Sequence, residues 1–364
     1  MPTPHNFHRY HFSHWLLLLL LLSSAYLGAC SSITPTTQLT SPTPIQITSS
    51  PSPAPTTEPA VEATTVPLTP RTVLVVPPGA NLAQADRLQE TIAELSASQD
   101  FEFEVQPSLS PEDLIADLRV VIAVPPDPGL ADLATNAPDT QFVGIAIPGL
   151  QPSVNLTVID SQVTSQDQQG FLAGYLAALI TPEWRVGAIT VNDTPAGLSA
   201  RQGFLNGVVF FCGLCRQTYP PFYTYPMYVE LPGSASPAEW QAAADVLIDK
   251  AVQTVYVAPG AGGEKLLEYL AKAGIKIIGA QPPTDTVRDQ WVATIQPDFS
   301  AALRQAWPDL VSGNSKADLN TALQLTDINP DLLSSGRQRL AEELMDDLQA
   351  GTIDTAVGEG GGDG

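Results

Sequence analysis

Histidine is nearly absent from this sequence, and its placement excludes several kinds of catalytic site. The chain has 4 histidines in 364 residues, and His5, His8, His11 and His14 all precede the apolar run Leu16–Leu22. Because we expect this start to be a cleaved leader, the mature chain would contain no histidine. Ser-His-Asp and Cys-His nucleophiles are then excluded, as are the usual zinc sites. Chemistry by carboxylates alone stays open, but we expect no enzyme, no metal and no cofactor.

Basic residues are scarce as well. The chain has 16 Lys and Arg against 38 Asp and Glu, which gives a formal net charge of −22 at pH 7. Such a chain is repelled by phosphate backbones and by anionic lipid headgroups. We therefore expect no nucleic-acid partner, and we expect the balance of charge to keep the protein in solution.

Cysteine is the third rare residue, and the first of the 3 cysteines is informative. Cys30 follows Leu27-Gly28-Ala29, and Arg9 is the only charge before the leucine run. A secretory signal peptide typically has a positively charged N-terminal region, a short apolar core and small residues at the cleavage site. The leucine run is shorter than the roughly 20 residues that a membrane-spanning helix needs. Leu-Gly-Ala-Cys resembles the lipobox of bacterial lipoproteins, which implies cleavage before Cys30 and an acylated (palmitate-bearing) thiol. The alternative is an ordinary secretory signal with an incidental cysteine.

The other two cysteines, Cys212 and Cys215, form a Cys-x-x-Cys motif. A redox or metal-binding motif is one interpretation, and a small structural disulfide in an oxidising compartment is the other. Because no second such pair supplies further metal ligands, we expect the disulfide.

Composition divides the chain into four parts. Residues 1–29 are the expected lipoprotein signal peptide, and residues 30–70 are a Thr/Pro/Ser-rich linker too poor in apolar residues to build a core. Residues 71–355 hold the folded domain, and residues 356–364 are a Gly-rich, acidic tail that we expect to be disordered.

Short Val/Ile-rich runs alternate with amphipathic stretches through residues 71–355. This alternation predicts an α/β domain with parallel sheets covered by helices on both faces. The expected strands are 72–76, 101–105, 119–124, 141–147, 185–191, 225–231, 254–258, 275–280 and 291–295. The expected helices are 82–95, 111–118, 129–135, 168–180, 195–211, 236–251, 263–273 and 330–350. We expect two lobes joined by a hinge, the first from about 71–183 and 285–355 and the second from about 184–284.

The middle of the chain resembles the basic membrane protein family of bacterial solute-binding lipoproteins, which includes purine nucleoside receptors. The residues that carry the resemblance are Gly170-Phe171-Leu172-Ala173-Gly174, Val186-Gly187, Asn192-Asp193, Gly203-Phe204 with Gly207, Val257 to Gly262, Ile277 to Ala280, and Leu340 to Ile353. The resemblance implies a type I periplasmic-binding-protein fold. It also implies a receptor that is anchored at the extracytoplasmic face of the cell membrane and delivers solute to the permease and ATPase subunits of an ABC importer.

Ligands of such sheets bind beyond the carboxyl ends of the strands. The candidate ligand-binding residues at those ends are Asn81, Asp127, Asp193, Gly260, Gly262 and Gln281. The resemblance implies that Asp127 lies on the family's second ligand loop, and that Gln281 stands where the family carries an aspartate suited to ribose hydroxyls. A glutamine accepts hydrogen bonds from such hydroxyls less strongly than a carboxylate does. We therefore expect a nucleoside-like or related solute whose ribose hydroxyls are bound more weakly than in the family.

Three interpretations stay open. Asp127 is either a ligand contact or a solvated turn residue, and Asp193 is either a ligand contact or a helix cap. Phe222, Tyr223, Tyr225 and Tyr228 either stack on a flat ligand or pack an irregular loop beside the disulfide.

The leading functional hypothesis is a solute-binding lipoprotein of an ABC importer. The alternative is a sensory or structural lipoprotein of the cell envelope with the same fold and no role in uptake.

Overall fold

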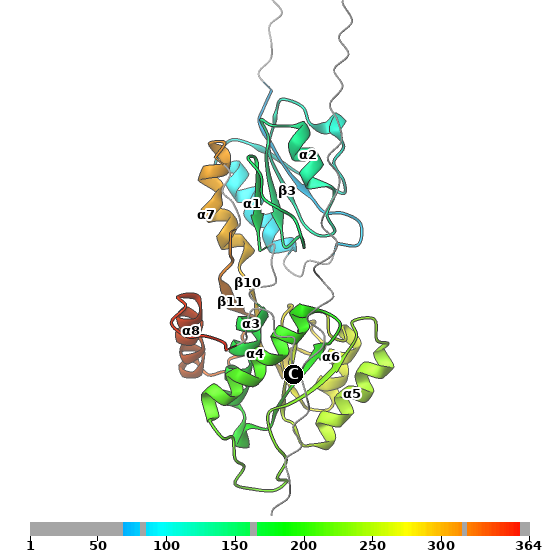
Figure 1. The fold of residues 1–364 in the computed structure, drawn as a ribbon, viewed down its shortest axis with the longest axis vertical. Helices are drawn as coiled ribbons and strands as arrows, with labels where there is room; N and C mark the ends of the chain where they lie inside the picture. Colours follow the sequence, from blue (N-terminus) through cyan, green and yellow to red (C-terminus); the bar gives the residue numbers. More distant parts are fainter. Residues whose placement is uncertain (1–67, 81–84, 161–165, 315–318, 357–364) are drawn as a thin grey trace, which may run out of the picture. The chain divides into compact units, whose positions relative to one another are not determined.

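The computed structural model describes residues 68–80, 85–160, 166–314 and 319–356. Cys30, Asn81, and most of the expected linker and tail lie outside these residues. Two parallel-dominated sheets, each with helices on both faces, make up most of the described part, and Figure 1 labels several of their strands and helices. We call them the first lobe and the second lobe and describe each by itself.

The first lobe is a five-stranded parallel sheet in the order β2-β1-β3-β4-β5. Its strands are β1 (Arg71–Val75), β2 (Glu102–Gln106), β3 (Leu118–Ala123), β4 (Gln141–Ile145) and β5 (Leu156–Ile159). Helix α2 (Leu130–Asn136) covers one face, and helices α1 (Ala85–Ala97) and α7 (Phe299–Val311) cover the other. Strands β1, β3, β4 and β5 are largely buried on both faces because both faces are covered, whereas the edge strand β2 is partly exposed.

The second lobe is a six-stranded sheet in the order β11-β10-β9-β8-β6-β7. Its strands are β6 (Val186–Val191), β7 (Met227–Leu231), β8 (Thr254–Val257), β9 (Lys276–Gly279), β10 (Trp291–Pro297) and β11 (Leu323–Thr326). All pairings are parallel except that of β10 with β11. The sheet is therefore mixed, with its one antiparallel strand at an edge.

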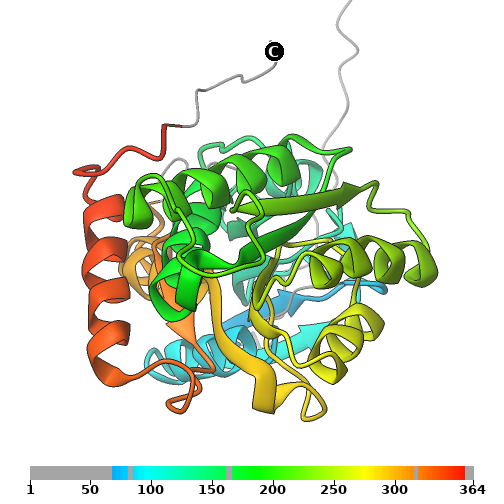
Figure 2. The ribbon, with the colours of Figure 1, turned by 90° about the horizontal axis from the view of Figure 1, so that it is seen from below.

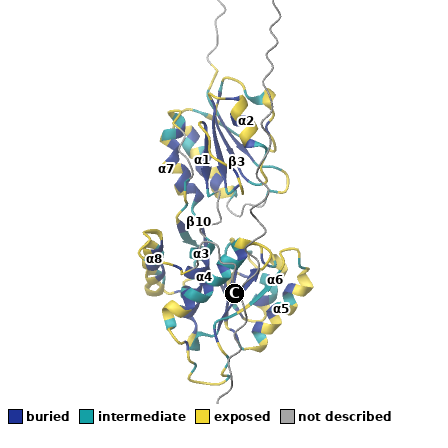
Figure 3. Ribbon diagram, viewed as in Figure 1, coloured by how far each residue is buried: buried dark blue, intermediate teal, exposed yellow. Residues whose placement is uncertain are grey.

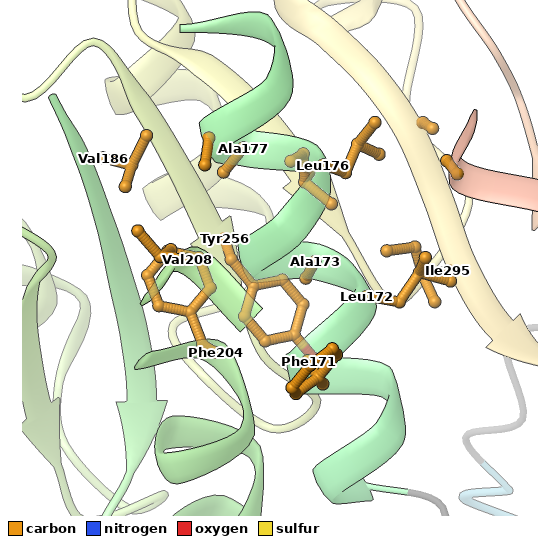
Figure 4. Close-up of a cluster of buried hydrophobic side chains, with 14 of the residues drawn as sticks. Phe171, Leu172, Ala173, Leu176, Ala177, Val186, Phe204, Val208, Tyr256 and Ile295 are labelled. Carbon is orange, nitrogen blue, oxygen red and sulfur yellow. The ribbon is translucent and has the colours of Figure 1, made fainter. Parts of the chain in front are cut away.

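Five helices cover the second sheet. Helices α3 (Gln166–Ile180), α4 (Pro195–Cys212) and α8 (Ser335–Gln349) pack on one face, and α5 (Pro237–Asp249) and α6 (Glu264–Lys272) pack on the other. Figure 2 shows α8 in red and the yellow-green helices α5 and α6 on different sides of this lobe. In the core beneath α3 and α4, Tyr256 lies parallel to Phe204 with ring centroids 5.9 Å apart (Figure 4).

The lobes are assembled from other segments than those we expected. Helix α3, strands β10 and β11, and helix α8 were assigned to the first lobe, but they pair and pack with the second sheet. The chain returns to the first lobe only at α7, after Pro297. Hydrophobic periodicity gives the type of an element but not the sheet that it joins, because pairing depends on contacts between distant residues.

Individual elements agree with the expectations with a few exceptions. The expected helix at 111–118 is only a 3₁₀ turn, Pro111–Asp113, with Ser110 and Asp113 in a capping box. Strand β5, helix α7 and strand β11 were not expected. At the start of α5, Ser236 and Glu239 form a capping box.

Candidate ligand pocket

A pocket of about 400 Å³ lies in the second lobe at the carboxyl ends of β8 and β9. Its size is within the range of small-molecule sites. Its lining comes from three loops and from the side chains beneath them. The lining residues are Gly233, Ala235, Trp240, Val257, Ala258, Pro259, Gly260, Ala261, Gly262, Gly263, Glu264, Leu267, Gly279, Ala280, Gln281, Pro282, Thr284 and Trp291. The pocket lies at the strand edge where parallel α/β sheets bind ligands.

Two buried tryptophans contribute to the pocket wall. Trp240 and Trp291 are each 1% exposed, although both line the pocket. The indole Nε1 of Trp291 donates a hydrogen bond to Thr294 Oγ1 at 3.1 Å, and Thr294 Oγ1 donates to the backbone carbonyl of Gln281 at 3.4 Å. The orientation of the Trp291 ring is thereby coupled to the loop that carries Gln281.

The loop between β8 and α6 presents its backbone to the pocket. Gly260 and Gly262 have φ values of +80° and +71°, which glycine adopts without the steric cost that a Cβ brings. The N–H groups of Ala261 and Gly263 donate to carbonyls of the same loop. No acceptor among the described residues engages the N–H groups of Gly260 and Gly262. The loop thus contributes two pocket-lining residues whose N–H groups are unpaired among the described residues.

Asp193 lies next to the pocket and binds one of its loops. Its Oδ2 accepts a hydrogen bond at 3.0 Å from the N–H of Gly233, which lines the pocket. The neighbouring Thr194, not Asp193, caps α4, because the Thr194 side chain accepts from the N–H of Gly197 at 3.1 Å. Asp193 is exposed, and its hydrogen bond links the loop after β6 to the loop after β7.

The other expected site residues fall into three groups. Gly260, Gly262 and Gln281 line the pocket together. Asp127 lies in the first lobe, where its Oδ1 accepts from the N–H groups of Gly129 and Leu130 at 2.9 and 3.0 Å and so holds the start of α2. Asn81 is outside the described residues.

Several pocket residues were missed by the sequence analysis, above all Trp240, Trp291, Gly233 and Thr284. The two tryptophans sit in a helix and a strand with the pattern of ordinary core residues. Gly233 and Thr284 follow strand ends, and that position was the one signal that could have singled them out.

The aromatic residues after the disulfide do not line this pocket. Cys212 and Cys215 are bonded to each other. Tyr225 is buried and its hydroxyl donates to the carbonyl of Lys250. The ammonium of Lys250 lies 4.6 Å from the centre of the Tyr223 ring, and the guanidinium of Arg201 lies 5.1 Å from that of Tyr228. These rings pack around the loop, while Phe222 stays 69% exposed.

The pocket carries little charge. Glu264 is the only ionisable residue in its lining, which contains no Lys or Arg. Near it, the Ser236 hydroxyl and backbone N–H hold the pKa of Glu239 below its usual range at the start of α5.

Within the described ranges, no group of three His, Cys, Asp or Glu is placed to hold a metal ion. None of the described helices has the length and apolar character needed to span a bilayer.

The chain is similar to solved structures in fold. One is a solute-binding protein of an ABC transporter system from Aeropyrum pernix K1, at 14% identity over 80% of this chain and 95% of that chain, with a TM-score of 0.52. Another is a transcriptional activator of the comK gene from Bacillus halodurans, at 13% identity over 77% of this chain and 98% of that chain, with a TM-score of 0.55. No family model and no curated protein sequence matches the chain.

These findings define the fold of the described residues. Two helix-covered, parallel-dominated sheets with a pocket at the carboxyl strand ends constitute a type I periplasmic-binding-protein fold.

Proposed function

We propose that the chain is a lipid-anchored, extracytoplasmic solute-binding protein of an ABC importer. The observation that carries the proposal is the pocket of about 400 Å³ whose glycine loop offers unpaired N–H groups at the carboxyl ends of β8 and β9. The name of the similar A. pernix structure and the resemblance of the sequence to the basic membrane protein family support the same role. The partners would be a small solute and the permease and ATPase subunits of the importer.

The lining supports a neutral or weakly polar organic solute. Val257, Ala258 and Leu267 supply apolar surface, and Gln281 and Thr284 supply an amide and a hydroxyl. A phosphorylated solute would need basic groups, and the lining has none. A nucleoside-like solute or a related one therefore remains the leading ligand class, held through its flat apolar part more than through its ribose.

Delivery to an importer requires that solute binding favours one arrangement of the lobes. A ligand shifts a conformational equilibrium only by its difference in affinity for the two states. We expect the solute to contact both lobes, with Asp127 or its loop as the contact from the first lobe.

Two experiments test the proposal: the first identifies a bound ligand, and the second measures the affinity of candidate ligands. The mature full-length chain, purified from its membranes in mild detergent, is analysed by native mass spectrometry for a retained small molecule. Calorimetry then measures binding of nucleosides, nucleobases, sugars and amino acids. We expect at least one neutral compound to bind with a Kd in the micromolar range or below, which corresponds to about −8 kcal/mol or better.

A pair of variants tests whether the solute binds in this pocket. Ala280→Trp fills the pocket with a side chain, whereas Ala273→Trp adds the same bulk at the exposed end of α6. We expect Ala280→Trp to weaken binding at least tenfold and Ala273→Trp to leave it within twofold. Equal effects would place the solute elsewhere, and no binding across the panel would favour the sensory or structural lipoprotein.

A further inference from the structure

Most of the exposed large apolar residues of the second lobe lie at the end of α4 and in the loop that follows it. Phe211, Leu214, Tyr219 and Phe222 are 38%, 79%, 67% and 69% exposed. We call these four residues the aromatic tip. Figure 3 shows much of the loop in yellow, the colour of exposed residues, at the end of the second lobe beyond α4.

The aromatic tip lies at the opposite edge of the sheet from the pocket. Helix α4 begins after the carboxyl end of β6 and runs back, so Cys212 and the loop lie near the amino ends of the strands. Arg185, which directly precedes β6, donates from its guanidinium to the carbonyls of Tyr219 and Pro220 at 3.1 and 3.0 Å. The surface is therefore independent of the candidate ligand pocket.

The backbone of this loop is held firmly while its side chains point outward. The Glu183 carboxylate accepts from the N–H groups of Thr218 and Tyr219. The disulfide between Cys212 and Cys215 closes the start of the loop. A fixed loop that keeps large apolar side chains in water is a feature of interaction surfaces, because such exposure otherwise costs free energy.

The charge around the aromatic tip differs from that of the whole chain. No Asp or Glu occurs from Thr194 to Val229, although the chain has 38 acidic residues. Arg216 is exposed and forms no ion pair with another described residue. Beside Phe211, a second pocket of about 250 Å³ is lined by Trp184, Glu183 and the exposed Arg337. The carboxylate of Glu183 keeps its negative charge while it accepts from backbone N–H groups of the loop. Arg216 and Arg337 add positive charge, and neither forms an ion pair with another described residue.

We propose that the aromatic tip inserts into the interface of the lipid bilayer to which the chain is anchored. Phe, Tyr and Leu bury apolar surface among the acyl chains, and arginine beside them meets the headgroup phosphates. The insertion is driven by apolar burial, so the net charge of −22 on the whole chain does not prevent it.

The sequence that precedes the described residues favours the bilayer as the partner of this surface. The inference rests on the anchoring part of the proposed function: an acylated Cys30 and a linker to residue 70 would keep the folded residues within on the order of 100 Å of the bilayer. The lipid anchor keeps the aromatic tip at a high effective concentration near the bilayer. A large fraction of the molecules can therefore make this contact even if its affinity is weak.

Photo-crosslinking in the intact cell envelope tests the proposal on the full-length chain. Benzoylphenylalanine replaces Phe222 in one variant. In the control it replaces Val246, which is 53% exposed on α5 of the same lobe. After irradiation, we expect mass spectrometry to find phospholipid adducts on the loop peptide at least tenfold more often than on the α5 peptide.

Each other outcome overturns the proposal. A crosslinked band at twice the mass would identify a second copy of the chain as the occupant, and a band of another size would identify a different protein. Equal lipid adducts at both positions, or none at Phe222 in acylated protein, would show that the tip is not inserted. If metabolic labelling shows no acyl group on Cys30, the anchor and this inference fail together, while calorimetry still tests solute binding independently.

Discussion

At the scale of single residues, Tyr256 is the clearest unsatisfied group in the core of the second lobe. Its side chain is fully buried, its hydroxyl has no hydrogen-bond partner among the described residues, and burial raises its pKa. A buried hydroxyl without a partner costs free energy of about 1–3 kcal/mol. We expect Tyr256→Phe to raise the free energy of unfolding by about 1 kcal/mol, measured by urea denaturation. Tyr225→Phe, which removes the bond to Lys250, should lower it by a similar amount, and a loss of stability in both variants would contradict the assignment.

Gly279 is the residue on which the position of the Trp291 ring depends. A Cβ at Gly279 would overlap the indole ring, whereas a Cβ at Gly187 in strand β6 would meet side-chain methyl groups of Leu247 at 3.3 Å and of Val252 at 3.4 Å. We expect Gly279→Ala to lower the free energy of unfolding by about 1–3 kcal/mol, because the core must shift to admit the methyl group. Near-ultraviolet circular dichroism should change with it. The control Gly187→Ala should cost under about 1 kcal/mol and leave that spectrum unchanged.

Asp193 is expected to act on the pocket through Gly233. Asp193→Ala removes the acceptor of the Gly233 N–H group, while Asp193→Asn keeps an oxygen in place. A single exposed hydrogen bond contributes about 1 kcal/mol, so we expect Asp193→Ala to weaken solute binding about three- to tenfold in calorimetry and Asp193→Asn to weaken it less. A loss of a hundredfold or more in both variants would instead indicate that the Asp193 carboxylate contacts the solute.

At the scale of elements, the loop that carries the aromatic tip should depend on pH. Hydrogen bonds from the N–H groups of Tyr219 and Thr218 hold the pKa of Glu183 below its ordinary value of 4.5. A lowered pKa means that the carboxylate stabilises the loop fully above that value and that this contribution is lost as the pH falls through the lowered one. We expect faster amide exchange in residues 215–222 on acidification below pH 4.5, after correction for intrinsic rates. Glu183→Gln should remove this pH dependence, and Glu90→Gln, at an exposed position of α1, should preserve it.

The elements also show what could be predicted locally. Strands such as β4 and β8 were predicted because apolar runs bounded by turns are a local signal. Helix α7 was missed, and it contains Pro308, a residue that normally interrupts helices. Strands β5 (Leu156–Ile159) and β11 (Leu323–Thr326) were missed as well, although each has the same length as β8. In each case the element is stabilised by pairing or packing with residues far away in the sequence.

At the scale of the whole molecule, attachment to the membrane should depend on one cysteine. We expect Cys30→Ala to move the chain from the membrane fraction to the soluble fraction, or to block processing of the leader, because the acyl group has no other site. Fractionation followed by immunoblotting measures this. The double variant Cys212→Ala with Cys215→Ala removes only the disulfide and should stay with the membranes. Processed Cys30→Ala protein that remains membrane-bound would contradict the lipobox interpretation.

The sequence by itself determined the α/β class, the alternation of strands and helices, and three of the residues that line the pocket. Apolar periodicity and strand-end position are local properties, so they can be read along the chain. Tertiary structure alone decided that β10, β11, α3 and α8 build the second lobe, and that Trp240 and Trp291 form part of the pocket wall. It also decided that Asp193 binds Gly233 while Thr194 caps α4. These features depend on contacts between residues that are distant in sequence. The free energy of such contacts cannot be inferred from a local sequence pattern.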